Sequence, residues 1–66
     1  MTIREQMLKQ KGKWKVVTKD KAKYVIDLDN MIFDSYDWYK QGQLNSELDI
    51  DIFNNIMDCM KSVNRI

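Results

Sequence analysis

The 66-residue sequence contains no histidine and no proline, two glycines and one cysteine. The absence of histidine excludes catalytic triads and dyads that depend on imidazole, and it excludes most zinc sites. Gly12 and Gly42 alone cannot form a glycine-rich phosphate-binding loop. A single cysteine excludes an intramolecular disulfide, which is typical of reducing compartments. We therefore expect a cytoplasmic protein with no cofactor and no metal site, in which Cys59 is a small buried apolar residue.

Long apolar segments are also missing. No stretch approaches the roughly 20 apolar residues that cross a bilayer, and the first residues lack the apolar run of a signal peptide. We expect no membrane partner and one compact domain over residues 1–66. A domain of this size buries only about 60% of its unfolded surface. We therefore expect a second copy of the chain, in a homodimer, or another partner to complete its core.

The net charge of +1 conceals an uneven distribution along the chain. Residues 1–24 contain eight basic and two acidic side chains, a net charge of +6. Residues 25–66 contain three basic and eight acidic side chains, a net charge of −5. Either the two halves neutralise each other within the fold, or the molecule has a basic face and an acidic face.

The first half of the chain predicts a helix and a β-hairpin. Thr2 and Glu5 have capping-box spacing, which predicts a helix over residues 3–10. Its inward side chains are expected to be Ile3, Met7 and Leu8. Residues 13–18 and 22–28 then alternate between apolar and polar side chains, as half-buried strands do.

The alternation also predicts the register of the hairpin. The inward side chains all occupy even positions, and they are Trp14, Val16, Thr18, Ala22, Tyr24, Ile26 and Leu28. Cross-strand partners must then have numbers with an even sum, and a loop over residues 19–21 provides this. The predicted pairs are Lys13 with Asp27, Trp14 with Ile26, and Val16 with Tyr24.

The second half predicts two helices. Asp29 and Asn30 offer an N-cap for a helix over residues 30–41, and residues 47–64 carry apolar side chains over about half of the helical circumference. The element order is then αββαα, in a small α+β domain whose hairpin packs on helices. In the alternative, residues 31–38 form a third strand after a tight turn at Asp29 and Asn30. That order, αβββα, is the order of double-stranded RNA-binding domains, but the basic motif of their last helix is absent here.

One short segment resembles the first motif of the haloacid dehalogenase superfamily, in which a strand ends in Asp27-Leu28-Asp29 and Asn30 follows. The resemblance implies a nucleophilic Asp27 that forms an aspartyl-phosphate, Asp29 as the acid/base, and magnesium bound by both. Such enzymes need a parallel sheet with further acids and a lysine from later strands, for which the remaining chain is too short. We therefore predict that the protein is not an enzyme, that Asp27 faces solvent opposite Lys13, and that Asp29 caps a helix.

The lysines of the predicted hairpin suggest one possible binding function. They are Lys13, Lys15, Lys19, Lys21 and Lys23, and all but Lys19 share the outward face. A two-stranded ribbon can enter the DNA major groove, and lysines can contact phosphates. Lysines on a solvated strand also prevent edge-to-edge aggregation, and the acidic second half would repel a polyanion. Nucleic-acid binding is therefore our alternative function.

Aromatic side chains suggest the function that we favour. On the predicted second helix they spread wider than the stripe of roughly 100° that one neighbouring element covers. Tyrosine and tryptophan often anchor protein interfaces. We predict that Tyr36, Trp38 and Tyr39 bind a protein partner and that Asp34 and Asp37 attract its basic surface. The chain would then be a small non-catalytic regulator or inhibitor. Its small size and its abundant Lys, Asn and Ile suggest an AT-rich genome, which fits an origin in a phage or other mobile element.

Overall fold

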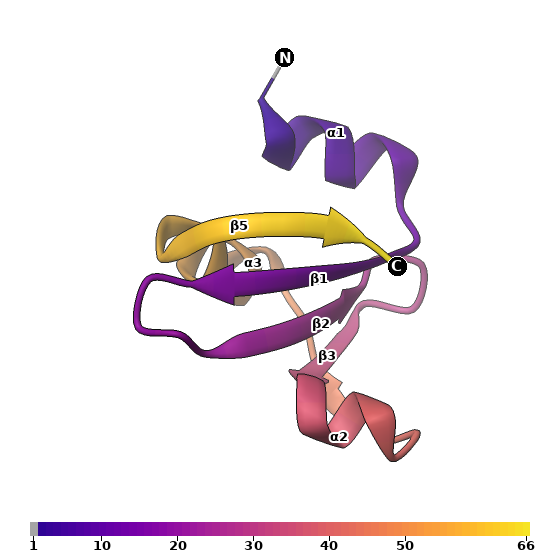
Figure 1. Cartoon of the computed structure of the whole chain (residues 1–66). Coiled ribbons are helices and arrows are strands. Elements are labelled where there is room, and N and C mark those ends of the chain that lie inside the picture. Colours follow the sequence, from indigo (N-terminus) through magenta and orange to yellow (C-terminus); the bar gives the residue numbers. More distant parts are fainter. Residues whose placement is uncertain (1) are drawn as a thin grey trace.

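Three helices and five strands follow one another along residues 2–66, the part of the chain that the computed structural model describes. They are α1 (Ile3–Gln10), β1 (Lys13–Thr18), β2 (Lys23–Asp27), β3 (Ile32–Ser35), α2 (Tyr36–Lys40), β4 (Ser46–Glu47), α3 (Ile50–Asp58) and β5 (Met60–Arg65) (Figure 1). All strand pairs are antiparallel, so the predicted α+β class is confirmed. None of the described helices is long and apolar enough to span a membrane.

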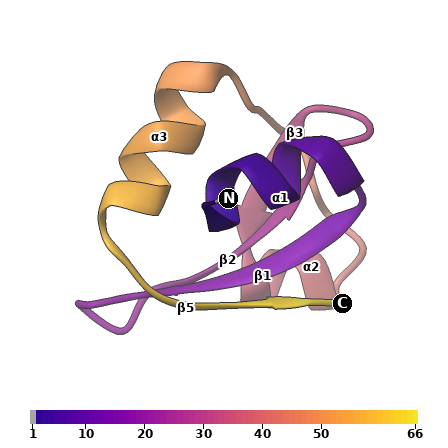
Figure 2. The ribbon, with the colours of Figure 1, turned by 90° about the horizontal axis from the view of Figure 1, so that it is seen from above.

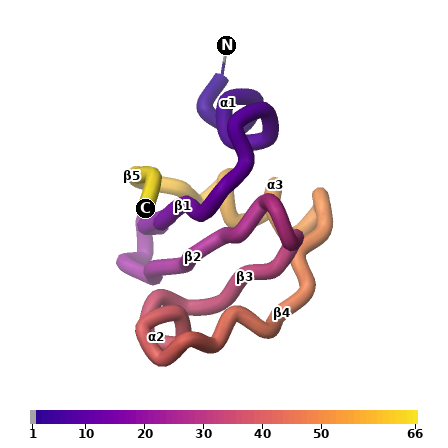
Figure 3. Tube along the Cα trace, turned by 90° about the vertical axis from the view of Figure 1, so that its right-hand side faces the viewer, coloured from indigo at the N-terminus to yellow at the C-terminus, as the bar shows by residue number. Residues whose placement is uncertain are grey.

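The strands form a single sheet in the order β4-β3-β2-β1-β5. β1, β2 and β3 are successive hairpin partners, and β4 lies beside β3. α3 then carries the chain to the opposite edge, where β5 pairs with β1 (Figures 1 and 3). This crossing makes the first strand in sequence a central strand of the sheet.

The register of the first hairpin is the predicted one. Lys13 pairs with Asp27, Trp14 with Ile26, and Val16 with Tyr24. The predicted inward residues Trp14, Val16 and Ile26 are all buried. The shared parity of the apolar positions was therefore enough to specify the pairing.

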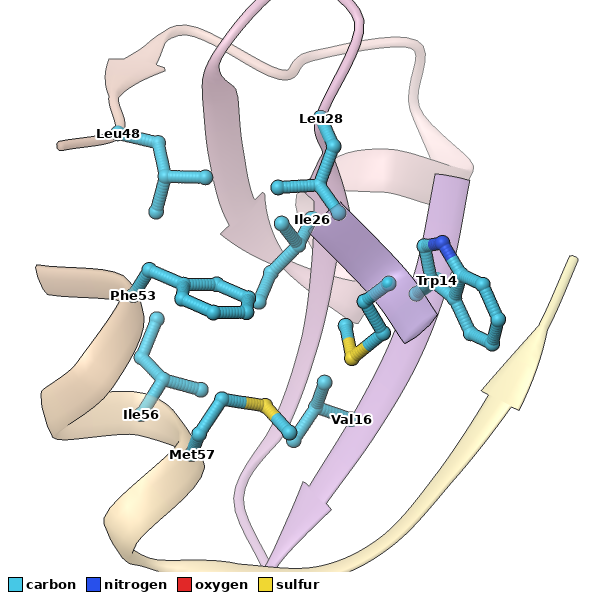
Figure 4. Close-up of a cluster of buried hydrophobic side chains, with 9 residues drawn as sticks. Trp14, Val16, Ile26, Leu28, Leu48, Phe53, Ile56 and Met57 are labelled. Atoms are coloured by element: carbon cyan, nitrogen blue, oxygen red, sulfur yellow. The ribbon is translucent and has the colours of Figure 1, made fainter. Parts of the chain in front are cut away.

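The core lies between this even-numbered sheet face and the two helices α1 and α3, which lie on the same side of the sheet (Figure 2). Its buried members are Met7, Trp14, Val16, Ile26, Leu28, Leu48, Phe53, Ile56 and Met57 (Figure 4). Both helices begin where the sequence supplies a cap. The side chain of Thr2 accepts a hydrogen bond from the Glu5 N–H, and that of Asp49 accepts one from the Ile52 N–H.

The other face of the sheet is partly covered by α2, which packs against β2 and β3. Val25 alternates with Ile26 along β2 and points to this second face, where it is fully buried. A cavity of about 260 Å³ on this face is lined by Tyr39 and Leu44 together with Asp27 and Ile32 of the sheet. The sheet is therefore shielded on both faces, although its principal core lies on only one.

The helix predicted over residues 30–41 is wrong in its first half, because Ile32–Ser35 form β3 and only Tyr36–Lys40 are helical. The alternative third strand over residues 31–38 is closer to the structure, although the observed strand is shorter. A strand here supplies hydrogen-bond partners to the free side of β2. Met31 allows the chain to reverse by adopting a φ of 53°, and Asp29 belongs to the turn rather than to a helix cap.

The helix predicted over residues 47–64 is also too long, since α3 ends at Asp58 and Met60–Arg65 form β5. An acidic residue in the last turn opposes the helix dipole. Serine, valine and asparagine, which follow, are modest helix formers. The observed element order is therefore αβββαβαβ. Two expected burials also fail, because Cys59 is exposed and Leu8 is 39% exposed.

Lys21 offers a test of the hairpin loop because its φ of 70° is unfavourable for a residue with a side chain. Left-handed backbone costs an ordinary residue roughly 1–2 kcal/mol, and glycine recovers most of this. We expect Lys21→Gly to raise the free energy of unfolding by about 0.5–1 kcal/mol, after the greater flexibility of glycine in the unfolded chain is included. Urea denaturation measures the change. Lys19→Gly, in the same loop without a positive φ, should lower stability, and the reverse ranking would contradict the loop geometry.

Candidate functional site

The Asp27-Leu28-Asp29 segment stabilises a hairpin turn. The carboxylate of Asp27 accepts hydrogen bonds from the backbone N–H groups of Asp29 and Asn30, at 3.0 and 3.2 Å, and from the Asn30 side chain at 3.0 Å. Asp27 lies opposite Lys13, as predicted, but it is buried and does not face solvent. Burial raises the pKa of Asp27. The hydrogen bonds and the charge of Lys13 together lower it by more than burial raises it, so the pKa lies below the ordinary value of 3.8.

This arrangement differs from the site implied by the dehalogenase resemblance. β2 and β3 are antiparallel neighbours joined by a short turn, and that turn uses the oxygens of Asp27. Within residues 2–66, no three histidine, cysteine, aspartate or glutamate side chains are grouped as a metal site would require. The geometry of these acids therefore fits the closing of a turn.

The hairpin that carries the five lysines lies inside the sheet. β1 and β2 are central strands whose outer sides pair with β5 and β3, so they do not form a free ribbon that could enter a groove. Lys13 lies opposite Asp27, and the Lys15 ammonium sits 4.3 Å from the centre of the Tyr36 ring. The remaining three, Lys19, Lys21 and Lys23, are exposed near the tip of the hairpin.

The predicted aromatic residues do come together, because all three lie on α2. Trp38 is 52% exposed, whereas Tyr36 and Tyr39 are half-buried with ring centroids 6.1 Å apart. The Ser35 hydroxyl caps the helix by accepting a hydrogen bond from the Trp38 N–H at 3.4 Å. We call Tyr36, Asp37, Trp38 and Tyr39 the α2 surface.

Two cations flank Tyr36. Besides Lys15, the ammonium of Lys40 lies 5.1 Å from the ring centre. Lys40 also forms an ion pair with the exposed Asp37, at 3.7 Å. Cation–π contacts of this kind hold a ring in one orientation. The sequence reasoning did not identify Lys15 and Lys40 as neighbours of the site, although the four-residue spacing of Tyr36 and Lys40 is a signal for a shared helix face.

The two predicted acids have different surroundings. The carboxylate of Asp34 accepts hydrogen bonds from the Asn45 N–H at 3.2 Å and from the Ser46 hydroxyl at 3.4 Å. Asp34 therefore ties β3 to the segment that enters β4. Asp37 is exposed beside Trp38 in sequence and contributes charge to the α2 surface.

The structure accordingly gathers the residues of the α2 surface on one short helix that is partly open to solvent. Comparison with known proteins adds no functional constraint. No family model, no curated protein and no solved structure matches the chain. Function must therefore be inferred from the geometry of this surface.

Proposed function

We propose that the chain is a non-catalytic protein that binds another protein through the α2 surface and acts as a regulator or inhibitor in the cytoplasm. The observation that carries this proposal is the half-exposed indole of Trp38 on a short, capped helix. The single cysteine supports a reducing compartment. The abundance of Lys, Asn and Ile supports an origin in a phage or other mobile element.

The exposure of Trp38 is informative because the fold does not use this side chain to fill its core. The nine buried residues of the core come from α1, β1, β2, α3 and the segments beside them, and none comes from α2. Tryptophan is among the residues that contribute most to protein interfaces, where it fills a pocket on the partner. A large apolar ring held at the surface therefore fits a binding role better than a structural one.

The position of Trp38 also limits the entropy that binding would cost. Ser35 caps the start of α2, and the N–H groups of Gln41 and Gln43 donate to the Trp38 carbonyl at its end. The backbone around the indole is thus ordered before a partner arrives. Pre-ordering of this kind strengthens binding because less freedom is lost in the complex.

Charge supports a partner with a basic surface. Asp37 is the exposed acid of the α2 surface, and further exposed acids, Asp29, Glu47, Asp49 and Asp51, lie elsewhere in the segments that follow β2. Exposed acids around an interface accelerate association with a basic surface and favour it over an acidic one. A partner that normally binds nucleic acid has a surface of this kind.

Trp38→Ala tests the proposal. We expect the variant to lose less than about 1 kcal/mol of stability, or at most about 4–8 °C in Tm, because the ring is half-exposed. We expect binding to the partner to weaken by about 2–4 kcal/mol, which corresponds to a roughly 30- to 700-fold higher Kd. Thermal melts and affinity capture from the native host lysate measure the two effects.

Leu8→Ala is the matched control, since Leu8 is also an exposed apolar side chain but lies on α1. It should retain the captured protein. If Leu8→Ala no longer captured that protein while Trp38→Ala still did, the interface would lie away from the α2 surface.

Nucleic-acid binding remains the second candidate, because one groove combines basic and aromatic side chains. This groove, of about 390 Å³, is lined in part by Lys21, Lys23, Tyr24 and Tyr36. Lysines beside tyrosine rings suit a single strand, whose phosphates and bases they can contact. A gel-shift assay with single-stranded oligonucleotides distinguishes this function, because such binding weakens steeply as salt rises.

A further inference from the structure

β5 lies at the edge of the sheet and has one strand beside it. Five of its six residues pair with β1, Lys61 falls at an irregularity of that pairing, and no strand among residues 2–66 lies along its other side (Figures 1 and 3). Four of the six, Lys61, Ser62, Asn64 and Arg65, are exposed. The edge at the other end of the sheet, β4, is only two residues long. β5 is therefore the one edge of the described sheet long enough to accept a further strand.

The hydrogen-bond phase shows which β5 groups are free. The Ile66 N–H donates to the Lys13 carbonyl at 3.1 Å, so these two residues form a hydrogen-bonded pair. Along an antiparallel ladder, hydrogen-bonded pairs alternate with pairs that are not hydrogen-bonded. Counting back from Ile66 in this register, the backbone N–H and C=O groups of Asn64 and Ser62 point towards β1. The N–H and C=O groups of Val63 and Arg65 point to the open side.

The charge of β5 selects its partner. The strand contains Lys61 and Arg65 and no acid, and the next strand adds Lys13 and Lys15. If two copies paired antiparallel through β5 with Val63 of one opposite Val63 of the other, Lys61 of each copy would lie opposite Arg65 of the other. Directly opposed like charges destabilise a strand pair, so a second copy is disfavoured and an acidic strand is favoured.

We propose that β5 binds an extended acidic segment of another protein, which adds a sixth strand to the sheet. The outward N–H and C=O groups of Val63 and Arg65 supply the backbone hydrogen bonds, as in other cases of strand addition. The ammonium of Lys61 supplies the preference for acids, since Lys15 and Arg65 lie against the Tyr36 and Trp14 rings and Lys13 lies opposite Asp27. This surface is separate from the α2 surface, so the inference does not depend on the proposed function.

The experiment uses a synthetic eight-residue peptide of alternating valine and glutamate, and its valine–lysine counterpart as a control. Amide hydrogen exchange is followed by NMR. On saturation with the acidic peptide, we expect exchange of the Val63 and Arg65 amides to slow by about tenfold or more, since exchange requires the new ladder to open. The basic peptide should leave both rates unchanged.

Two variants test the site itself. Val63→Pro removes an outward N–H and no hydrogen bond to β1, so we expect a folded protein that binds the acidic peptide at least about tenfold more weakly. Lys61→Glu should weaken binding more than Lys23→Glu, which makes the same charge change on β2. This matched pair keeps the test decisive if Val63→Pro does not fold.

Three results would overturn the proposal. The first is unchanged exchange at Val63 and Arg65 in the presence of the acidic peptide. The second is equal weakening by Lys61→Glu and Lys23→Glu, which would indicate a general charge effect. The third is slow exchange at both amides in the absence of peptide, with rates that fall as the protein concentration rises. That result would show that a second copy of the chain binds at β5. Trp38→Ala should bind the peptide normally, which separates this test from that of the α2 surface.

Discussion

Replacing Trp14 with alanine is expected to unfold most of the protein at room temperature. The indole is 6% exposed, and its Nε1–H donates to the Lys11 carbonyl at 2.8 Å. The guanidinium of Arg65 also lies over the ring, 5.3 Å from its centre. Truncating a buried tryptophan costs about 3–5 kcal/mol, and a chain of this length has a total stability of about 3–10 kcal/mol. The loss is therefore comparable with the whole stability.

The two tryptophans form a matched pair for this measurement. Circular dichroism melts of Trp14→Ala and Trp38→Ala compare the same chemical change at a core site and at a surface site. We expect the cooperative transition to be lost or greatly lowered in the first variant and to persist in the second. If Trp14→Ala melted like the wild type while Trp38→Ala lost its cooperative transition, the assignment of Trp14 to the core and Trp38 to the surface would be contradicted.

Asp27→Asn is expected to lower the free energy of unfolding by about 1–3 kcal/mol at pH 7, because hydrogen bonds to a buried charged group are stronger than those to a neutral one. The carboxylate receives three hydrogen bonds that close the β2–β3 turn. An amide has only one oxygen to accept them, and it no longer attracts Lys13. Asp29→Asn, an exposed change in the same turn, should alter stability by less than about 0.5 kcal/mol.

The effect of Asp27 depends on pH with a definite sign. Its folded pKa lies below the ordinary 3.8, so the folded protein binds its proton more weakly than the unfolded chain does. The stability from this shift is present above 3.8 and is lost as pH falls through the folded pKa. Urea titrations at neutral and acidic pH should therefore show the gap between wild type and Asp27→Asn narrowing in acid. A constant gap would show that the charge of Asp27 is not responsible.

The parts of the fold that were predicted correctly depend on local signals. The helix over residues 3–10 follows from the cap at Thr2, and the hairpin register follows from the parity of its apolar positions. The errors in the predicted ends of the second and third helices arise where the apolar residues fit both a helical and a strand period. Val63, for example, continues the apolar stripe of a helix, yet it also fits an alternating strand. The strand forms because the free side of β1 offers it hydrogen-bond partners, and this contact exists only in the folded chain.

The candidate site was predictable to a similar extent. The exposure of Trp38 follows from the excess of aromatic residues in its segment, and the structure places the Tyr36 and Tyr39 rings beside each other. The surroundings of Asp34 could not be predicted, because its hydrogen-bond donors, Asn45 and Ser46, come from a segment that returns to β3 only in the folded chain. The cation–π contact of Lys15 with Tyr36 likewise depends on the packing of α2 over the sheet.

Hydrogen–deuterium exchange of the protein with and without its captured partner tests the binding role of the α2 surface most directly. The proposal predicts that the partner slows amide exchange in residues 35–44, which comprise α2 with its cap and the loop that follows. Exchange at the tip of the β1–β2 hairpin should change little. Slower exchange confined to the hairpin tip, with residues 35–44 unaffected, would contradict the proposal and favour the lysine groove as the binding site.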